Sequence, residues 1–412
     1  MVRVAFVTQW FPPEPAYVPL SIVQSLSASG IDIRVLTGMP NYPEGKIYEG
    51  YPRWPGSVDE FDGLTLQRAP LFPNRSSSTL KRTLNYLSFS TTAAAHSKRV
   101  LAGADVTLVY GSPATAAIPA LYAKRRWGTP FVFMVQDLWP DSVFSTGFLN
   151  SGLKGSLAST ALNRLMTTIY HEASQIIAIS PGMIEELRNR GVPPEKLTLL
   201  YNWANEKPPK ASTTSRDVRT ELGIPEDSLM LLYAGNHGYA QGLDSWIHAM
   251  EKNRDSSKAH LVLIGSGPHK KELEELTQTL GVDRVHLLDP VSQENLTPYT
   301  LASDAMIISL TDKPLFSITI PGKTQEALFA EKPILASIAG DVSELIRGSN
   351  CGFVAEPSNP ESIAQCIRKA EKLGRENLSS MGIRSKQLYS ELMERQKGAK
   401  ILNEALTAAQ IH

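Results

Sequence analysis

Short apolar runs alternate with amphipathic stretches along the whole chain. In the first half the apolar runs are continuous in Val, Ile and Leu, which is typical of parallel strands buried on both faces. The predicted strands of this half lie at residues 2–9, 32–38, 105–111, 130–136 and 175–180. Helical patterns lie between them, for example at residues 19–30, where Gly30 is a helix-ending residue.

A polar segment at residues 201–217 interrupts the alternation. It contains two prolines and several serines and threonines but no apolar periodicity, and this predicts a linker. The alternation then restarts, with predicted strands at residues 229–235, 260–267, 284–289, 304–310 and 332–337. We therefore predict an α/β protein with two doubly wound domains, at residues 1–203 and 204–390, and a C-terminal helix at residues 391–412. The favoured ligand site is the cleft between the domains, at the carboxyl ends of the strands.

The composition is that of a folded globular protein. The chain has 412 residues, of which 42% are hydrophobic and 20% are charged. Its 41 basic and 41 acidic residues cancel, so there is no reason to expect a nucleic-acid partner. Residues 1–200 hold 18 Lys and Arg against 14 Asp and Glu, a charge of +4, which is compatible with an anionic substrate or membrane surface in that half.

Targeting signals and cysteine usage favour a protein of the cell interior. Cys351 and Cys366 provide neither a disulfide framework nor a metal cluster, which favours a reducing compartment. The apolar run at the N-terminus is too short for a signal peptide. No run approaches the roughly 20 apolar residues that a membrane-spanning helix needs. We expect a cytoplasmic protein, free in solution or peripheral on the inner face of the cell membrane.

Glycines follow two predicted strands of the second half. They are Gly235, Gly238 and Gly242 after the strand at 229–235, and Gly265 and Gly267 after the strand at 260–267. Glycines at such positions let backbone N–H groups approach a phosphate, whereas a plain strand–helix turn uses glycine for geometry alone. The second pair is not a G-x-G-x-x-G dinucleotide fingerprint, because position 270 is lysine.

Residues 317–337, SITIPGKTQEALFAEKPILAS, place two opposite charges on the first turn of an apolar helix. Lys323 has the wrong sign for a helix N-terminus, where the macrodipole favours an anion. Glu326 has no Ser or Thr three positions earlier, so it does not form a capping box. A phosphate at the helix N-terminus and a ribose whose hydroxyl groups donate to Glu326 would explain both residues. The pair therefore indicates a nucleotide site, and the alternative is a simple i, i+3 ion pair.

Polar residues also follow the predicted strands of the first half. Gln136 and Asp137 come after the strand at 130–136, and Ser112 comes after the strand at 105–111. Asp137 is a candidate for contact with a sugar hydroxyl group or for proton transfer, and the alternative is a helix cap. A long turn-rich loop at residues 38–54 contains Tyr42 and Lys46, and loops of this length are often functional.

An ordered set of segments from about residue 36 to residue 337 resembles the retaining GT-B glycosyltransferases of family 4. The chain is similar to a subgroup that transfers amino sugars in bacterial surface-polysaccharide assembly. The matching segments are TGMPNYPEGKIYEGY, VQDLWPDS, AISPGMIEEL, YNWAN, YAGNHGYAQGLD, LIGSGP and IPGKTQEALFAEKPILAS. The resemblance implies two Rossmann-like domains, with a nucleotide-diphosphate sugar held mainly by the second and a glycan or polyprenyl-diphosphate-linked acceptor held mainly by the first. It also implies a final helix that crosses back to the first domain, and transfer with retention that needs neither cofactor nor metal.

The resemblance assigns roles to individual residues. Glu326 matches the family's ribose-binding carboxylate, the second Glu of an E-x7-E pattern. The first Glu of that pattern is replaced by Ile318, so backbone groups near Thr319 and Gly322 are expected to contact the donor sugar instead. Arg and Lys residues that neutralise the diphosphate in many members are replaced by Asn236 and Gln241. Lys323 is the cation that remains, which increases its expected importance.

These inferences define a predicted site in two parts. The predicted donor-binding residues are Gly235, Asn236, His237, Gly238, Gln241, Gly265, Gly267, Thr319, Gly322, Lys323 and Glu326. The predicted acceptor-binding residues are Tyr42, Lys46, Ser112, Gln136 and Asp137, and the predicted catalytic residues are Asp137, Lys323 and Glu326. His237 and His269 are isolated in the sequence, so no metal is expected. Two other functions stay open, a nucleotide-sugar 2-epimerase of the same fold and a non-catalytic nucleotide-sugar-binding protein.

Overall fold

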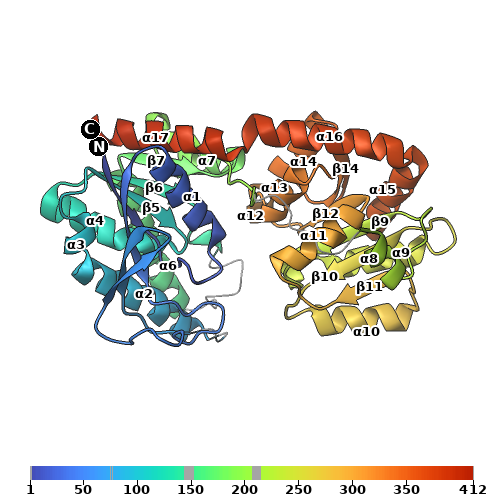
Figure 1. Ribbon diagram of the computed structural model, residues 1–412, viewed down its shortest axis with the longest axis horizontal. Helices are drawn as coiled ribbons and strands as arrows, with labels where there is room; N and C mark the ends of the chain where they lie inside the picture. Colours follow the sequence, from blue (N-terminus) through green and yellow to red (C-terminus); the bar gives the residue numbers. More distant parts are fainter. Residues whose placement is uncertain (1, 75, 77, 143–152, 207–214, 412) are drawn as a thin grey trace. The chain divides into compact units, whose positions relative to one another are not determined.

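The computed structural model describes residues 2–74, 76, 78–142, 153–206 and 215–411. The chain divides into two compact units. Unit 1 comprises residues 1–202 and 395–412, and unit 2 comprises residues 203–394. In each unit, helices pack along a mostly parallel sheet (Figure 1). The predicted linker at 201–217 falls partly on residues 207–214, which lie outside the described residues.

Unit 1 is built on an eight-stranded sheet with the order β3-β4-β2-β1-β5-β6-β7-β8. Its strands are β1 Arg3–Val7, β2 Asp32–Gly38, β3 Ser57–Phe61, β4 Leu64–Ala69, β5 Val106–Gly111, β6 Phe131–Val135, β7 Gln175–Ala178 and β8 Leu197–Leu199. Its helices are α1 Tyr17–Ala28, α2 Thr79–His96, α3 Lys98–Leu101, α4 Ile118–Trp127, α6 Leu153–Glu172, α7 Pro181–Asn189 and α17 Arg395–Ile411, with short 3-10 turns at η1 Ala114–Ala117 and η2 Pro194–Lys196. The strands pair in parallel except for β3, which is antiparallel to β4.

Unit 2 is built on a six-stranded parallel sheet with the order β11-β10-β9-β12-β13-β14. Its strands are β9 Met230–Ala234, β10 His260–Ile264, β11 Val285–Leu288, β12 Ala305–Ser309, β13 Ile334–Ser337 and β14 Gly352–Ala355. Its helices are α8 Ser215–Glu221, α9 Leu243–Lys252, α10 Lys270–Leu280, α11 Gln293–Ala302, α12 Pro314–Ser317, α13 Gly322–Phe329, α14 Asp341–Gly348, α15 Pro360–Leu373 and α16 Arg375–Leu392, with a 3-10 turn at η3 Tyr239–Gln241.

The continuous apolar runs form the central strands, as predicted. Each of the predicted strand segments contains a strand, and residues such as Val4, Phe6 and Val7 of β1 are fully buried. The predicted helix at 19–30 is α1, and Gly30 follows it with a φ of 82°. Two doubly wound α/β units are thus confirmed. In both sheets the strand order reverses beside the first strand, next to β1 in unit 1 and next to β9 in unit 2.

Four strands were not predicted from the sequence: β3, β4, β8 and β14. β3 and β4 form an edge hairpin whose turn consists of Asp62 and Gly63, both with positive φ. An Asp-Gly pair between two apolar-containing segments is a strong hairpin signal, and it could have identified both strands. β8 and β14 have three and four residues, which is too short for a clear hydrophobic pattern.

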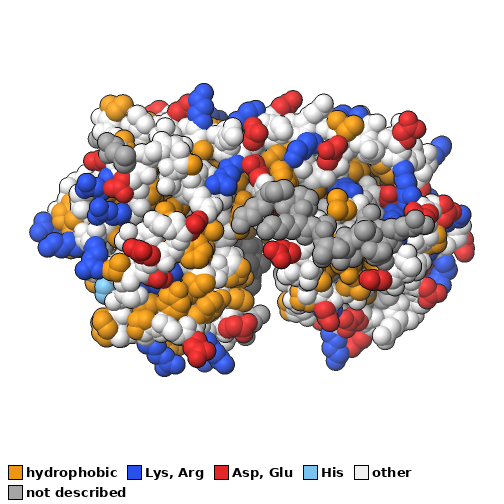
Figure 2. Space-filling model, in the orientation of Figure 1, with side chains coloured by type: hydrophobic (Ala, Val, Ile, Leu, Met, Phe, Trp, Pro, Cys, Tyr) orange, Lys and Arg blue, Asp and Glu red, His pale blue; other side chains and the backbone are white. Residues whose placement is uncertain are grey.

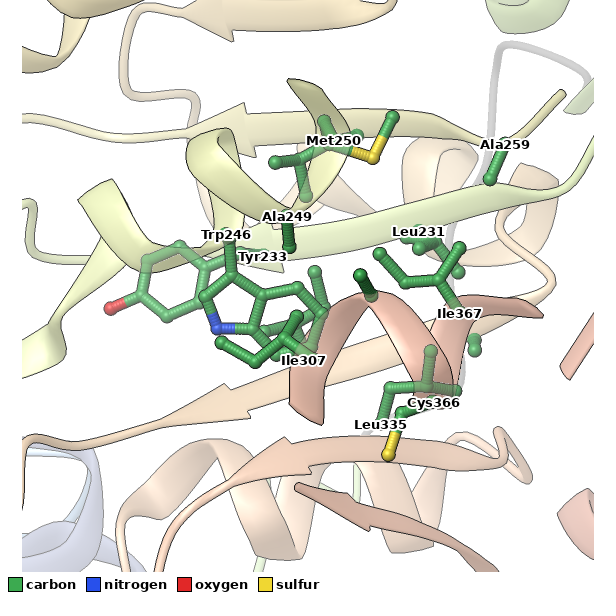
Figure 3. Packing of buried hydrophobic residues seen from close by; sticks show 14 of the residues in the cluster. Leu231, Tyr233, Trp246, Ala249, Met250, Ala259, Ile307, Leu335, Cys366 and Ile367 are labelled. Carbon is green, nitrogen blue, oxygen red and sulfur yellow. The ribbon is translucent and has the colours of Figure 1, made fainter. Parts of the chain in front are cut away.

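A large aromatic side chain fills the centre of the unit 2 core. Trp246 of α9 is fully buried and lies beside Tyr233 and Ile307 of the sheet (Figure 3). Its indole Nε1 donates to Ser309 Oγ at 3.1 Å, so the ring buries its apolar surface without an unpaired N–H group. Cys366 of α15 packs in the same cluster as a free thiol. This core fixes the carboxyl end of β12, where part of the candidate site lies.

Candidate active site

The predicted donor residues lie on loops at the carboxyl ends of the unit 2 strands. Gly235 follows β9, Gly265 follows β10, and α13 begins at Gly322 after β12. β9 pairs with β10 on one side and with β12 on the other, so these loops leave the sheet edge next to one another. This is the position at which the strand order reverses, where open parallel sheets bind their ligands.

Lys323 lies directly over Gly235. A Cβ atom on Gly235 would be 2.1 Å from Lys323 Nζ and 2.5 Å from its Cε, so any side chain at 235 would displace the lysine. The Nζ atom also lies 5.2 Å from the centre of the Tyr233 ring, where the ring face attracts a cation. The structure thus brings together two residues that the sequence predicts on separate loops.

The glycines of the two strand-end loops allow their backbones to pack together. A Cβ on Gly265 would be 1.8 Å from the Gly235 carbonyl oxygen, and a Cβ on Gly267 would be 2.4 Å from the His237 carbonyl oxygen. The loops are joined by hydrogen bonds from Gly235 N to the Ile264 oxygen and from His237 N to the Ser266 oxygen, both of 2.8 Å. These N–H groups are therefore used within the protein. Of the two interpretations of these glycines, phosphate contact and turn geometry, the pairing of Gly235 N and His237 N favours geometry at these two positions, because the glycines allow close packing and leave room for Lys323.

Asn236 and Gln241 hold the turn in shape. Gln241 Oε1 accepts from Gly238 N at 3.1 Å and from Asn236 Nδ2 at 3.3 Å. The Gln241 backbone oxygen accepts from Ser309 Oγ at 2.6 Å, which ties the turn to the end of β12. Both amide side chains thus form hydrogen bonds within the turn itself. Among the residues that the sequence predicts to bind the donor, the one with a positive charge is Lys323.

The first turn of α13 presents both predicted charges. Pro321 precedes the helix, and the first turn of any helix leaves backbone N–H groups without intrahelical acceptors. Burial lowers the pKa of Lys323, and the nearby Glu326 raises it by less. Burial likewise raises the pKa of Glu326, and Lys323 opposes that shift. For both side chains, the cost of burying the charge is therefore only partly offset by the neighbouring opposite charge. This is expected of groups that bind a polar ligand.

The remaining predicted donor-binding residues, Thr319, Gly322 and His237, differ in their exposure to solvent and in their hydrogen bonds. Gly322 is exposed, and a Cβ there would meet no atom within 4 Å, so a ligand has open access to the start of α13. Thr319 is half-buried, and its hydroxyl donates to the Leu315 oxygen at 2.8 Å. His237 is fully buried, and this burial lowers its pKa to about 4. The imidazole is thus neutral at pH 7 and packs against Gly265, where an added Cβ atom would be 3.1 Å from His237 Nε2.

On unit 1, Ser112 and Asp137 meet as the strand register predicts. β5 and β6 pair in parallel with Gly111 opposite Val135, so the residues that follow them are neighbours. Ser112 Oγ donates to Asp137 Oδ2 at 3.2 Å. The carboxylate is reachable by solvent yet closely surrounded by protein, and this partial desolvation raises the pKa of Asp137, while the bond from Ser112 lowers it by less. Gln136 points to another partner, since its Oε1 accepts from Asn202 Nδ2 at 2.9 Å.

A buried glutamate that sequence reasoning missed holds the loop containing Tyr42. Glu14 is 2% exposed, and its Oε1 accepts from the backbone N–H groups of Asn41 and Tyr42, each at 2.8 Å. Its Oε2 accepts from Phe11 N at 3.2 Å. Burial raises the pKa of Glu14 to about 7 against the effect of these bonds. Lys46 is exposed on the same loop, and the structure records no contact that links it to Asp137 among the described residues.

Four aromatic rings connect this loop to the strand end that bears Asp137. Ring centres are 6.0 Å apart for Trp10 and Tyr42, 6.3 Å for Trp10 and Tyr86, and 5.9 Å for Tyr86 and Trp139. Trp139 is 7% exposed, and its backbone N donates to the Asp137 oxygen at 3.1 Å. Aromatic surfaces suit the apolar faces of sugar rings and isoprenoid chains. The residues come from four distant segments, so no local sequence signal identifies the group.

Within the described part of the chain, no group of three or more His, Cys, Asp or Glu residues is placed to hold a metal ion. The expectation that the protein works without a metal stays a prediction. No helix among the described residues is both long and apolar enough to span a bilayer.

Two family profiles cover most of the chain. Residues 15–203 match the glycosyl transferase 4-like domain, and residues 214–388 match glycosyl transferases group 1. The chain belongs to the GT-B glycosyltransferases of this group. The first matched range falls almost entirely in unit 1 and the second falls in unit 2, so each matched domain contains one part of the candidate site.

Bacterial relatives of this glycosyltransferase match along most of their length. One is the Escherichia coli (strain K12) protein named "Putative colanic acid biosynthesis glycosyl transferase WcaI", which is 26% identical over 91% of this chain and 93% of its own. Another is "Probable glycosyltransferase WbjE" of Pseudomonas aeruginosa, 27% identical over 74% of this chain and 76% of its own. The predicted resemblance to the GT-B glycosyltransferases of family 4 is thereby confirmed, whereas retention and the transfer of amino sugars stay predictions.

Solved structures show the same fold. Anabaena HepE in complex with UDP has a TM-score of 0.71 and 16% identity, and the match covers 99% of this chain and 100% of HepE. Sucrose-phosphate synthase of Thermosynechococcus elongatus has a TM-score of 0.70 and 15% identity, with 98% of both chains covered. At these identities the likeness concerns the fold alone.

Proposed function

We propose that this glycosyltransferase moves a sugar from a nucleoside-diphosphate donor, UDP-linked by preference, to a glycan or polyprenyl-diphosphate-linked acceptor, with retention at the anomeric carbon. The sugar we favour is an N-acetylamino sugar. The E. coli relative named for colanic acid biosynthesis supports a role in surface-polysaccharide assembly. The HepE structures with UDP and UDP-glucose support a uracil nucleotide. Catalysis would need neither a metal nor another cofactor, and the protein would work in the cytoplasm or at the inner face of the membrane.

The observation that carries the proposal is the position of Lys323 Nζ over Gly235, with Glu326 one turn further along α13. A diphosphate at the start of α13 would meet the lysine charge and the first-turn N–H groups together. A ribose at Glu326 would donate its vicinal hydroxyl groups to the two carboxylate oxygens. The charges of Lys323 and Glu326 are both partly buried and only partly compensated by the protein, which is consistent with this use.

In the transfer step, the bond from the anomeric carbon to the diphosphate oxygen breaks and its electron pair leaves with the nucleoside diphosphate. Negative charge builds on that phosphate while the sugar becomes oxocarbenium-like. Lys323 and the α13 N-terminus stabilise the developing charge more than the bound ground state, which is what accelerates the step. The acceptor oxygen forms the new bond, and its proton passes to the leaving phosphate or to Asp137.

Retention is compatible with two routes. The acceptor can attack the same face that the diphosphate leaves, or a protein nucleophile can give two successive inversions. Both routes need the same stabilisation of the leaving diphosphate by Lys323. On the acceptor side, Asp137 would orient a sugar hydroxyl group or accept its proton, and the raised pKa of its carboxyl group suits a proton acceptor.

A transfer assay tests the proposal. A thermal-shift screen of nucleotide sugars first identifies the donor, because a ligand that binds the folded state raises the melting temperature. The purified protein is then incubated with that donor, with and without a polyprenyl-diphosphate-linked acceptor, and the products are examined by mass spectrometry and NMR. We expect acceptor-dependent release of nucleoside diphosphate and a product of retained anomeric configuration. An epimerised sugar nucleotide formed without acceptor, or donor binding without turnover, would contradict the proposal.

A further inference from the structure

A cavity of about 550 Å³ opens at the amino ends of the unit 2 strands. We call it the amino-edge cavity, and its charged lining residues are Arg219, Glu226, Asp304, Lys332 and Arg375. Asp304 directly precedes β12, and Lys332 lies two residues before β13. The predicted donor residues lie at the carboxyl ends of the same sheet, on the order of 15 Å away along the strands. The cavity is therefore separate from the candidate donor site, and its volume is in the range of small-molecule sites.

One cation of the cavity, Arg219 of α8, has a structural role. Its side chain is buried, and its guanidinium donates to the Asp304 carboxylate. It also donates to three backbone oxygens, those of Pro225, Ser228 and Ala302. Asp304 Oδ2 further accepts from Met230 N at 2.7 Å, at the start of β9. The pair of Arg219 and Asp304 thus joins α8 to the sheet, and the fold explains it without a ligand.

Arg375 is a second cation, and the fold explains it less well. It is the first residue of α16, where a positive charge opposes the helix macrodipole, and its side chain is 41% exposed. Its Nε lies 2.9 Å from Asp304 Oδ1, and its Nη2 donates to the Ser228 oxygen at 2.7 Å. Among the described residues, Asp304 is the carboxylate that contacts Arg375, and Arg219 already neutralises it. Arg375 therefore adds a surplus positive charge to the cavity.

Lys332 is the third cation, and its recorded partners in the described part of the chain are uncharged. The half-buried side chain donates from Nζ to the Leu301 oxygen at 3.1 Å and to the Ser303 oxygen at 2.6 Å. Burial lowers the pKa of Lys332, the nearby Asp304 raises it by less, and Arg219 lowers it further. The charge of Lys332 is thus only partly compensated by the protein.

The surplus of cations is local. Residues 201–412 contain 23 Lys and Arg against 27 Asp and Glu, and acidic and basic side chains are mixed over the face of unit 2 in Figure 2. In the amino-edge cavity, three cations surround the single carboxylate of Asp304, since Glu226 is exposed to solvent at its rim. The surplus of two positive charges would be balanced by a phosphate monoester, which carries nearly two negative charges at pH 7.

We infer that the amino-edge cavity binds a small phosphate ester, with Lys332 and Arg375 contacting its phosphate group. Arginine provides paired N–H donors for phosphate oxygens, and lysine provides a compact charge. Leu301 is 50% exposed in the lining and offers apolar surface to the organic part of the ester. The inference concerns a second ligand site on unit 2 and does not rest on the proposed function.

Isothermal titration calorimetry with the full chain tests this inference. The probes are inorganic phosphate and phenyl phosphate, with acetate as a comparison at equal ionic strength. All proteins carry Lys323→Ala, so that the proposed donor site contributes little to phosphate binding. The test variants are Lys332→Gln, Arg375→Gln and Glu226→Gln. The matched control is Lys271→Gln, which removes a lysine charge whose side chain is 86% exposed on α10.

We expect both phosphates to bind the Lys323→Ala protein, phenyl phosphate more tightly, and acetate not to bind. Lys332→Gln and Arg375→Gln should each weaken phosphate binding at least about fivefold, because each removes one charge–phosphate contact. Glu226→Gln should strengthen it about twofold, because a negative charge leaves the rim, and the control should be unchanged. A gain of affinity in Glu226→Gln is a result that a purely structural ion network would not give.

Thermal melting checks the folding of each variant. If Lys332→Gln does not fold, Arg375→Gln and Glu226→Gln decide, since both change exposed side chains. Unchanged phosphate affinity in these variants, or no phosphate binding once Lys323 is removed, would overturn the inference. UDP titration of the same cavity substitutions in the Lys323-containing protein separates it from the proposed function. UDP affinity should not change there, and a failure of UDP to bind would contradict the proposed function alone.

Discussion

Lys323 Nζ lies 2.1 Å from the point that a Cβ atom on Gly235 would occupy. The lysine thus packs on the bare backbone of a strand-end turn, and only glycine leaves the space for it. Because Lys323 also lies in the first turn of α13, its charge is close to the place where the helix dipole favours an anion. This relationship brings together two sequence signals, a glycine turn and a lysine at a helix N-terminus, at the position where we propose that an anion binds.

Gly235→Ala should weaken nucleoside-diphosphate binding by about 10- to 100-fold, because the new methyl group displaces Lys323. The φ of 146° at this position adds backbone strain, so a modest fall in melting temperature is also expected. Isothermal titration calorimetry with UDP measures the affinity. Gly348→Ala is the control, since a Cβ there meets no atom within 4 Å, and it should bind UDP like the wild type. Equal affinity in both variants would show that Lys323 is not positioned by Gly235.

Glu326→Ala should weaken UDP binding by roughly tenfold and remove the benefit of the ribose hydroxyl groups. In the wild type, 2′,3′-dideoxy-UDP should bind less tightly than UDP. In the variant the two nucleotides should bind alike, because the carboxylate that accepts from the hydroxyl groups is gone. A double-mutant cycle from four calorimetric titrations gives the coupling between carboxylate and hydroxyl groups. A coupling near zero would place the ribose elsewhere.

Asp137→Asn should lower the transfer rate by about 10²- to 10⁴-fold while UDP affinity stays within about twofold, because Asp137 lies on unit 1 and is proposed to act on the acceptor. Ser112→Ala tests the electrostatics of the same pair. The Ser112 hydrogen bond lowers the pKa of Asp137, so its loss should shift the acidic limb of the pH–rate profile to higher pH. A profile that does not move would mean that Asp137 does not titrate in the transfer step.

Glu14 should make the protein less stable as the pH rises from about 4.5 to about 7. Its pKa is raised from 4.5 to about 7 in the folded protein, so the folded state binds the proton more tightly than the unfolded state. The resulting stabilisation is complete below pH 4.5 and is lost as the pH rises through about 7, with a total on the order of 3 kcal/mol. Urea unfolding at several pH values measures it.

The control for Glu14 is Glu14→Gln, which removes the titrating group and keeps one oxygen for the Asn41 and Tyr42 N–H groups. This variant should have a flatter stability profile over the same range. It should also be less stable at low pH by about 1–2 kcal/mol, because its amide N–H₂ faces the Phe11 N–H group. A wild-type profile that matches the variant's would mean that Glu14 ionises at an ordinary pKa.

The sequence predicts features that depend on short segments. Continuous apolar runs identified the central strands, and residues that directly follow neighbouring strands, such as Ser112 and Asp137, were expected at one sheet edge and do meet there. Lys323 stood out because its charge has the wrong sign for a helix N-terminus, and Glu326 because it lacks a capping partner three residues earlier. In each case the physical signal lies within a few residues of the side chain concerned.

Features that depend on distant contacts could not be predicted in this way. The contact of Lys323 with Gly235 joins residues on separate loops, and the bonds of Glu14 to Asn41 and Tyr42 require the fold to bring the segments together. The sequence left open whether the N–H groups of the glycine turn face a phosphate, and the structure pairs Gly235 N with the Ile264 oxygen and His237 N with the Ser266 oxygen. Local sequence shows which groups are available, and only the fold shows which of them are already paired.

The central claim is that the start of α13, with Lys323, binds the diphosphate of the donor. Its most direct test is calorimetric titration of UDP and of uridine into the wild type and Lys323→Ala, with Lys313→Ala as a nearby surface-lysine control. We predict that UDP binds the wild type and the control much more tightly than uridine does, and that this difference falls by about 10- to 100-fold in Lys323→Ala while uridine affinity is unchanged. A difference between UDP and uridine that survives the loss of Lys323 would contradict the claim.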